Sequence, residues 1–141
     1  MEAKSMNLTV RSFAENLDDF GLSESTESDT QTAKATVFES DGVITVKYLQ
    51  KTEGGEYSTV LTLDKDKLTL RREGAICGAM EFSLGKITKT VYSVPPYSFD
   101  AEIETKRLKS SLTENGGTLE LLYFLTIGGA KKRMRLSLTL Y

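Results

Sequence analysis

Arg72 is the residue of this chain whose position most directly suggests a binding site. It follows Leu68 and Leu70 at alternating positions, and alternate side chains of a β-strand point to the same face. A charged group on a face with two leucines must be paired or must bind an anion, because an unpaired buried charge is costly. Two interpretations stay open. Arg72 grips the carboxylate or phosphate of a ligand, or it closes one end of the fold by bonding strand-end carbonyls, Glu73 or Glu81.

Hydroxyl side chains on other predicted strands are candidate neighbours of this arginine. The candidate ligand-binding residues are Arg72, Tyr48, Thr59, Tyr92, Thr105 and Tyr123. A buried phenol commonly finds a backbone partner and nothing more, so a purely structural role stays open. Arg72→Ala should cost about 3 kcal/mol if the partner is a buried charge. Arg71→Ala, on the opposite face, should stay within about 0.5 kcal/mol.

Other kinds of chemistry find little support in the composition. The chain has no histidine and a single cysteine, Cys77, which excludes Ser-His-Asp and Cys-His triads, imidazole metal sites and an internal disulfide. No phosphate-binding glycine motif and no calcium-loop spacing is present. We therefore expect a protein that is not an enzyme and that uses no cofactor and no metal.

Charge is distributed unevenly along the chain. Residues 1–41 hold nine acidic and three basic side chains, whereas the remaining residues hold eleven acidic and fifteen basic ones, and the total is −2. The basic residues at 106–109 and 131–135 resemble a phosphate-binding patch, but nucleic-acid domains usually carry a stronger positive charge with interleaved exposed aromatics. We interpret this charge as solvated and expect no nucleic-acid or membrane partner.

Leu122 and Phe124 form a candidate contact surface. They alternate with Leu121, Tyr123 and Leu125, so a fold that buries the second set turns the first set outward. An exposed Leu-Phe pair favours a homodimer or another protein partner. The intramolecular alternative is coverage by the N-terminal segment, through one or more of Phe13, Leu17, Phe20 and Leu22.

The elements that must position these residues are β-strands. From about residue 31 onward, apolar and polar residues alternate with a period of two between turn signals such as Asp41-Gly42 and Asn115-Gly116-Gly117. This pattern predicts nine strands, with a tenth at residues 6–13, and no helical periodicity competes with them. We therefore expect one domain over residues 1–141, an all-β, up-and-down antiparallel β-barrel of about eight to ten strands, whose interior can hold one small ligand.

The segment at residues 14–30 is expected to differ from the rest. It carries six acidic side chains and no basic one, among Ser and Thr residues. Such a composition cannot bury enough apolar surface to fold alone. We predict a mobile acidic loop there, with one helical turn near residues 16–20.

Several stretches of residues 31–141 carry a resemblance to a known family: residues 59–63, residues 70–76 with Arg72 and Gly74 at an Arg-x-Gly motif, Tyr92, Thr105, and residues 117–123. In these stretches the chain resembles the YwiB-like family of bacterial proteins, which are calycin-like (lipocalin-like) β-barrels with a domain of unknown function. The resemblance implies the barrel and brings no established activity.

The N-terminal residues show neither a signal peptide nor a lipidation motif, so we expect a cytoplasmic protein. Our functional hypothesis is a lipocalin-like barrel that binds a small amphipathic or anionic ligand. The alternative is a non-catalytic protein-interaction module that uses the outer sheet face, as a homodimer or with another partner.

Overall fold

Ten antiparallel strands form one continuous sheet that curls into a nearly closed barrel, as predicted. The computed structural model describes residues 3–141. The strands are β1 (Lys4–Leu17), β2 (Ser23–Ser40), β3 (Val43–Thr52), β4 (Gly55–Asp64), β5 (Lys67–Gly74), β6 (Gly78–Ser83), β7 (Ile87–Val94), β8 (Tyr97–Ser110), β9 (Gly117–Ile127) and β10 (Ala130–Leu140). The described residues include no helix, and so none long and apolar enough to cross a membrane.

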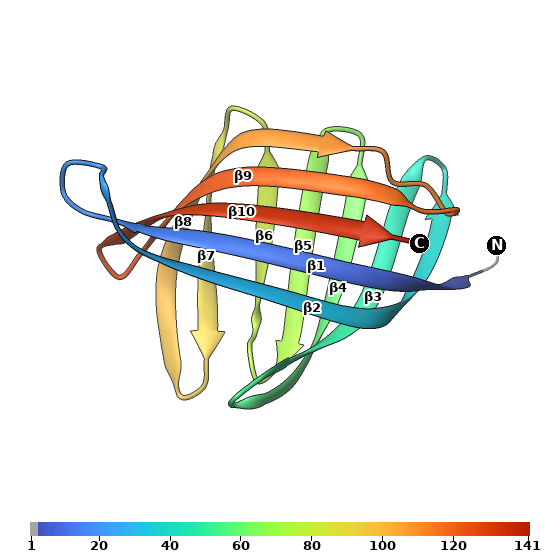
Figure 1. Ribbon diagram of the computed structural model, residues 1–141, viewed down its shortest axis with the longest axis horizontal. Coiled ribbons are helices and arrows are strands. Elements are labelled where there is room, and N and C mark those ends of the chain that lie inside the picture. Colours follow the sequence, from blue (N-terminus) through green and yellow to red (C-terminus); the bar gives the residue numbers. More distant parts are fainter. Residues whose placement is uncertain (1–2) are drawn as a thin grey trace.

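The sheet consists of two meanders joined at β1. Its strand order is β6-β5-β4-β3-β2-β1-β10-β9-β8-β7, so the only hydrogen-bonded neighbours that are not consecutive are β1 and β10. In Figure 1, β1, β9, β10 and much of β2 and β8 run across the front, and β3 to β7 cross behind them at a steep angle. The long strands β2 and β8 bend from one layer into the other. A register shift between Thr105 and Arg107 lies in β8, and such bulges bend strands.

The barrel closes where β6 meets β7, and side chains contribute to this seam. Cys77, just before β6, exchanges two backbone hydrogen bonds of 2.8 Å with Ser93. Further along, the hydroxyls of Thr88 and Thr90 donate to the backbone oxygens of Glu81 and Ala79, at 2.6 and 2.5 Å. Threonine hydroxyls therefore bond to strand carbonyls where a regular ladder would use backbone amides.

The core lies on the inward faces of the strands and has the predicted parity. Leu61, Leu68, Phe82, Leu119 and Leu138 are fully buried. They alternate with outward polar side chains, so burial of this apolar area is the main stabilising term of the fold. The inward side chains pack together as one hydrophobic cluster.

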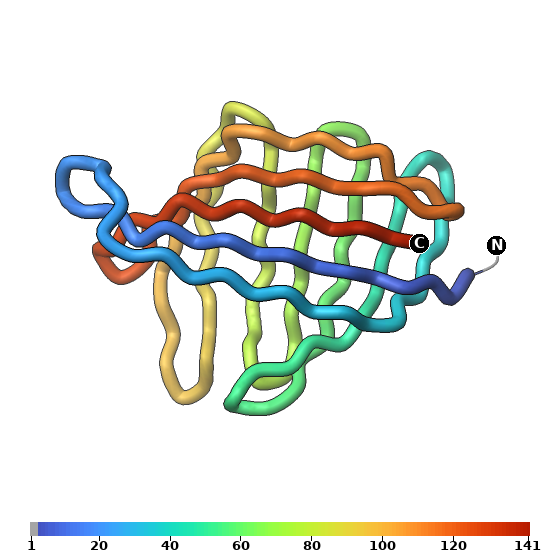
Figure 2. The backbone as a smooth tube through the Cα atoms, viewed as in Figure 1, coloured from blue at the N-terminus to red at the C-terminus, as the bar shows by residue number. Residues whose placement is uncertain are grey.

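The prediction of a mobile acidic loop with a helical turn at residues 14–30 is wrong about the secondary structure. Residues 14–17 and 23–30 belong to β1 and β2, and only residues 18–22 form a turn. These residues need no core of their own, because β10 pairs with β1 as far as the rung Leu17↔Lys131. We call residues 15–29 the acidic arm; its tip extends beyond the barrel (Figure 2).

Candidate functional site

Arg72 lies on the inward face of β5, as the parity of Leu68 and Leu70 predicts. Its ladder partners are Thr59 in β4 and Gly78 in β6. One guanidinium nitrogen, Nη1, donates to the hydroxyl of Tyr92 at 3.3 Å. The guanidinium carbon also lies 5.7 Å from the ring centre of Tyr57, within the range of a cation–π contact.

Arg72 has no carboxylate partner. None of the ion pairs among residues 3–141 includes it, and its Nε is buried without an acceptor. Glu81, one of the partners considered, pairs with Lys67 at 2.9 Å, and Glu73 is exposed. The side chain as a whole keeps partial exposure, so the guanidinium lies near one end of the barrel. The expected cost of about 3 kcal/mol for Arg72→Ala assumed a buried charged partner; that condition is not met.

Four phenols, those of Tyr48, Tyr57, Tyr92 and Tyr123, lie around Arg72 where a carboxylate would be expected. Burial raises the pKa of Tyr48 to about 12, although the charge of Arg72 opposes the shift. Burial also raises the pKa of Tyr123 to about 12, and the charge of Arg72 again opposes the shift. Burial also raises the pKa of Tyr57, and the charge of Asp29 acts in the same direction. Tyr48, Tyr57 and Tyr123 are therefore neutral at physiological pH and cannot balance the guanidinium.

Two glycines allow the strands to approach closely around this arginine. Gly74 has a φ of +124°, and a Cβ there would lie 2.6 Å from the backbone oxygen of Glu56 and 2.9 Å from the Cα of Tyr57. A Cβ at Gly78 would lie 3.3 Å from Cδ2 of Tyr92. The Arg-x-Gly motif thus has a physical reason: Gly74 lets β4 place the Tyr57 ring against Arg72.

The structure brings some of the predicted site residues together and leaves others apart. Tyr92 accepts the hydrogen bond from Arg72, and Tyr48 and Tyr123 lie near enough for the charge of Arg72 to oppose the rise in their pKa values. Thr59 donates instead to Gln50 Oε1 at 2.8 Å, and both of these side chains are buried. Thr105 is buried with an unpartnered hydroxyl, and no hydrogen bond joins it to Arg72.

Tyr57 was missed among the candidates, although it shares strand parity with Thr59 and Leu61. Its partnership with Arg72 depends on the register between β4 and β5 across Gly74, which alternation alone does not fix.

A second group that sequence reasoning missed lies on the β7–β8 hairpin. Val94, Tyr97 and Phe99 share the inward parity of Tyr92 and Ala101, yet they are exposed by 41%, 66% and 40%. The β8–β9 ladder ends at Ala101↔Ile127, so the hairpin extends past its neighbour. Apolar side chains on the inward face are thereby left uncovered at the tip of this hairpin.

Leu122 and Phe124 point outward, as predicted, but they are half-buried rather than fully exposed. Lys131, Arg133 and Lys106 lie over the Phe124 ring, at 5.0, 5.5 and 5.7 Å from its centre. From the N-terminal segment, Phe13 lines a groove together with Leu122. Phe20 and Leu22 remain exposed and cover neither residue.

Comparisons with known proteins agree on the fold. The family described as a domain of unknown function (DUF1934) matches residues 20–138. The crystal structure of the ywiB protein from Bacillus subtilis aligns with a TM-score of 0.77 at 17% identity, over 96% of this chain and 92% of that chain. At that identity the likeness concerns the fold alone. No curated protein matches the chain at a significant level.

Proposed function

Because the chain belongs to the DUF1934 family, whose description assigns no activity, we propose a function from the Arg72 site: binding of a small amphipathic anion at this end of the barrel. The observation that carries the proposal is a guanidinium whose Nε is buried without an acceptor and which has no carboxylate partner among the described residues. A buried charge in this state is destabilising unless something neutralises it. A carboxylate, phosphate or sulfonate group of a ligand would do so through charge-assisted hydrogen bonds.

The surroundings of Arg72 favour an anion that also has an apolar part. The exposed inward side chains Val94, Tyr97 and Phe99 follow Tyr92 around the β7–β8 hairpin, and Tyr92 bonds to Arg72. An acyl or aryl group that covers these side chains would bury apolar area worth about 25 cal/mol per Å². Because the inward side chains form one packed hydrophobic cluster, such a ligand would approach from this end rather than occupy the full interior.

The proposed role is binding without catalysis. The pKa values of Tyr48 and Tyr123 are raised to about 12 by burial, which makes these phenols weak general bases at neutral pH. They can donate hydrogen bonds to an anion that Arg72 holds.

Calorimetric titration with decanoate, with decanol as the uncharged analogue, tests this proposal. We expect decanoate to bind the full chain and Arg72→Met to weaken that binding by about tenfold or more, as the loss of a charged hydrogen bond predicts. Arg71→Met is the matched control on the outer face of the same strand and should bind normally. Equal affinity of the two variants, or equal binding of decanoate and decanol, would show that Arg72 is structural. Absence of decanoate binding to the unmodified chain would also contradict the proposal.

A further inference from the structure

The acidic arm presents an ordered apolar tip to solvent. Asp18 fixes the turn, since its carboxylate accepts hydrogen bonds from the backbone amides of Phe20 and Leu22, at 2.9 and 2.8 Å. The side chains of Phe20 and Leu22 are nevertheless 90% and 66% exposed. A fixed turn that leaves two large apolar side chains in water has the features of a contact element.

The surface around this tip on the arm is uniformly negative. Between residues 14 and 30 the chain has six carboxylates and no lysine or arginine. Glu15 alone among them forms an ion pair, with Arg133 at 3.5 Å. A partner for the tip should therefore combine an apolar floor with positive charge.

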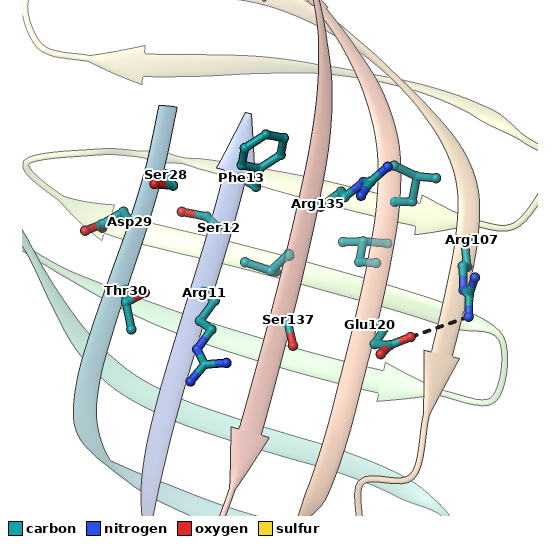
Figure 3. A pocket seen from close by; sticks show the side chains of 13 residues that line it. Arg11, Ser12, Phe13, Ser28, Asp29, Thr30, Arg107, Glu120, Arg135 and Ser137 are labelled. Carbon is teal, nitrogen blue, oxygen red and sulfur yellow. Dashed lines mark ion pairs between the residues drawn. The ribbon is translucent and has the colours of Figure 1, made fainter. Parts of the chain in front are cut away.

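The outer face of β1, β8, β9 and β10 has this combination. A groove of about 660 Å³ crosses it and reaches β2. Phe13 and Leu122 line this groove together with three arginines, Arg11, Arg107 and Arg135, and two carboxylates, Asp29 and Glu120 (Figure 3). Arg107 is paired with Glu120 at 3.6 Å. Arg11 and Arg135 have no carboxylate partner among the ion pairs of residues 3–141.

Ser28 and Asp29, at the base of the arm, line one edge of this groove, but the apolar tip of the same arm cannot enter it. Phe13, which lines the groove from β1, and Phe20, which lies in the turn that follows β1, belong to the same β1–β2 hairpin. At roughly 3.3 Å per residue, the tip lies on the order of 20 Å further along the strand direction. The tip therefore lies beyond the residues that line the groove, and Figure 2 shows this hairpin turn projecting past the rest of the backbone.

We propose that the occupant of this groove is the acidic arm of a second copy of the chain. Phe20 and Leu22 pack against the floor at Phe13 and Leu122, and carboxylates of the arm face Arg11 and Arg135. A twofold axis makes the exchange reciprocal, because each copy supplies one arm and one groove. This homodimer is independent of the anion site at Arg72, which lies on the inward face of β5.

A charge-swap experiment on the full chain tests the proposal by sedimentation velocity. We expect the unmodified chain to form a dimer that weakens as salt is raised. The groove variant Arg11→Glu/Arg135→Glu and the arm variant Asp19→Lys/Glu24→Lys should each weaken the homodimer by more than about 100-fold, because like charges then face each other. The control Arg71→Glu, exposed on β5, should remain dimeric.

Mixing the two variants provides the decisive readout. In the mixed dimer the reversed arm faces the reversed groove, and the unmodified arm faces the unmodified groove, so a heterodimer should form from two chains that are monomeric alone. Phe20→Ser should also be monomeric while retaining the near-ultraviolet circular dichroism spectrum of the fold. A monomeric unmodified chain, a dimer that both double variants retain, or the absence of a heterodimer would each overturn the proposal. Binding of an oligonucleotide to the groove of a chain that stays monomeric would also overturn the proposal.

Discussion

The inner and outer faces of this barrel treat cationic side chains in opposite ways. On the outer face, Arg133 pairs with Glu15, Arg107 with Glu120 and Lys106 with Glu104. The hydrogen bond from Lys106 lowers the pKa of Glu104. On the inner face, the ionisable groups around Arg72 are phenols, and its buried Nε has no hydrogen-bond acceptor among residues 3–141.

This difference identifies the cationic side chain that would gain most from binding a small anion. An exposed cation is already stabilised by water, whether or not a carboxylate pairs with it, so its replacement changes little. A cation in the core that lacks a counterion lowers stability until an anion arrives. The inner arginine, and not the more numerous outer ones, is therefore the side chain whose energy a small anionic ligand changes most.

The largest loss of stability should follow from substitution of Gly74, whose backbone supports the inner site. Gly74→Val should destabilise the protein by about 3 to 4 kcal/mol, because it combines a disfavoured positive φ with overlap against Glu56 and Tyr57. Denaturant unfolding measures this loss. Gly85→Ala is the control, since Gly85 has a φ of +76° with no atom within 4 Å of an added Cβ, and it should cost only about 1 kcal/mol. Equal losses would mean that close packing at Gly74 is unimportant.

The inner phenols should make the fold sensitive to alkali. Burial raises the pKa of Tyr48 and of Tyr123 to about 12 from the usual 10.0, so the folded state holds these protons more tightly than the unfolded state does. Their stabilising contribution is complete below pH 10 and is lost as the pH rises toward 12, by about 2 kcal/mol for each phenol. Melts across this interval, compared between the unmodified chain, Tyr48→Phe and Tyr123→Phe, measure it. If both Phe variants kept the full alkaline loss, these phenols would not be its source.

Removal of the inner charge should increase stability. Arg72→Met retains an unbranched apolar stem and deletes an uncompensated charge, and we expect it to stabilise the protein by about 1 to 2 kcal/mol in the absence of ligand. This gain in stability would accompany the loss of decanoate binding, as expected for a binding site that lowers the stability of the fold. A destabilisation of similar size would reveal a strong internal partner for the guanidinium and would weaken the contrast between the two faces.

The smallest effect is expected on the outer face. Arg71→Ala should change the free energy of unfolding by less than about 0.5 kcal/mol, because Arg71 is exposed and belongs to no ion pair of the described residues. A larger change than that of Arg72→Ala would contradict the strand parity on which the inner site depends.

Alternation predicted the strands and the inward side of Arg72, Tyr48, Tyr92 and Tyr123 from the sequence, because a period of two is a local property. The segment at residues 14–30 was mispredicted, since its polar strands are stabilised by the pairing of β1 with distant β10 and of β2 with β1. The contact of Tyr57 with Arg72 and the cover of Phe124 by Lys131 and Arg133 also depend on register between strands. These non-local pairings are absent from any single stretch of sequence.

The pairing of β1 with β10 has a consequence for the order in which the chain can fold. Asn7 and Tyr141 exchange backbone hydrogen bonds of 2.9 and 3.0 Å, so the first strand receives one of its two neighbours only when the last strand exists. A ribosome would thus release most of the polypeptide before the two meanders could join. Contacts between such distant residues slow folding. A circular permutant that links the two ends and opens between β6 and β7 would pair every strand with its neighbour in the chain, and it should therefore fold faster than the natural order.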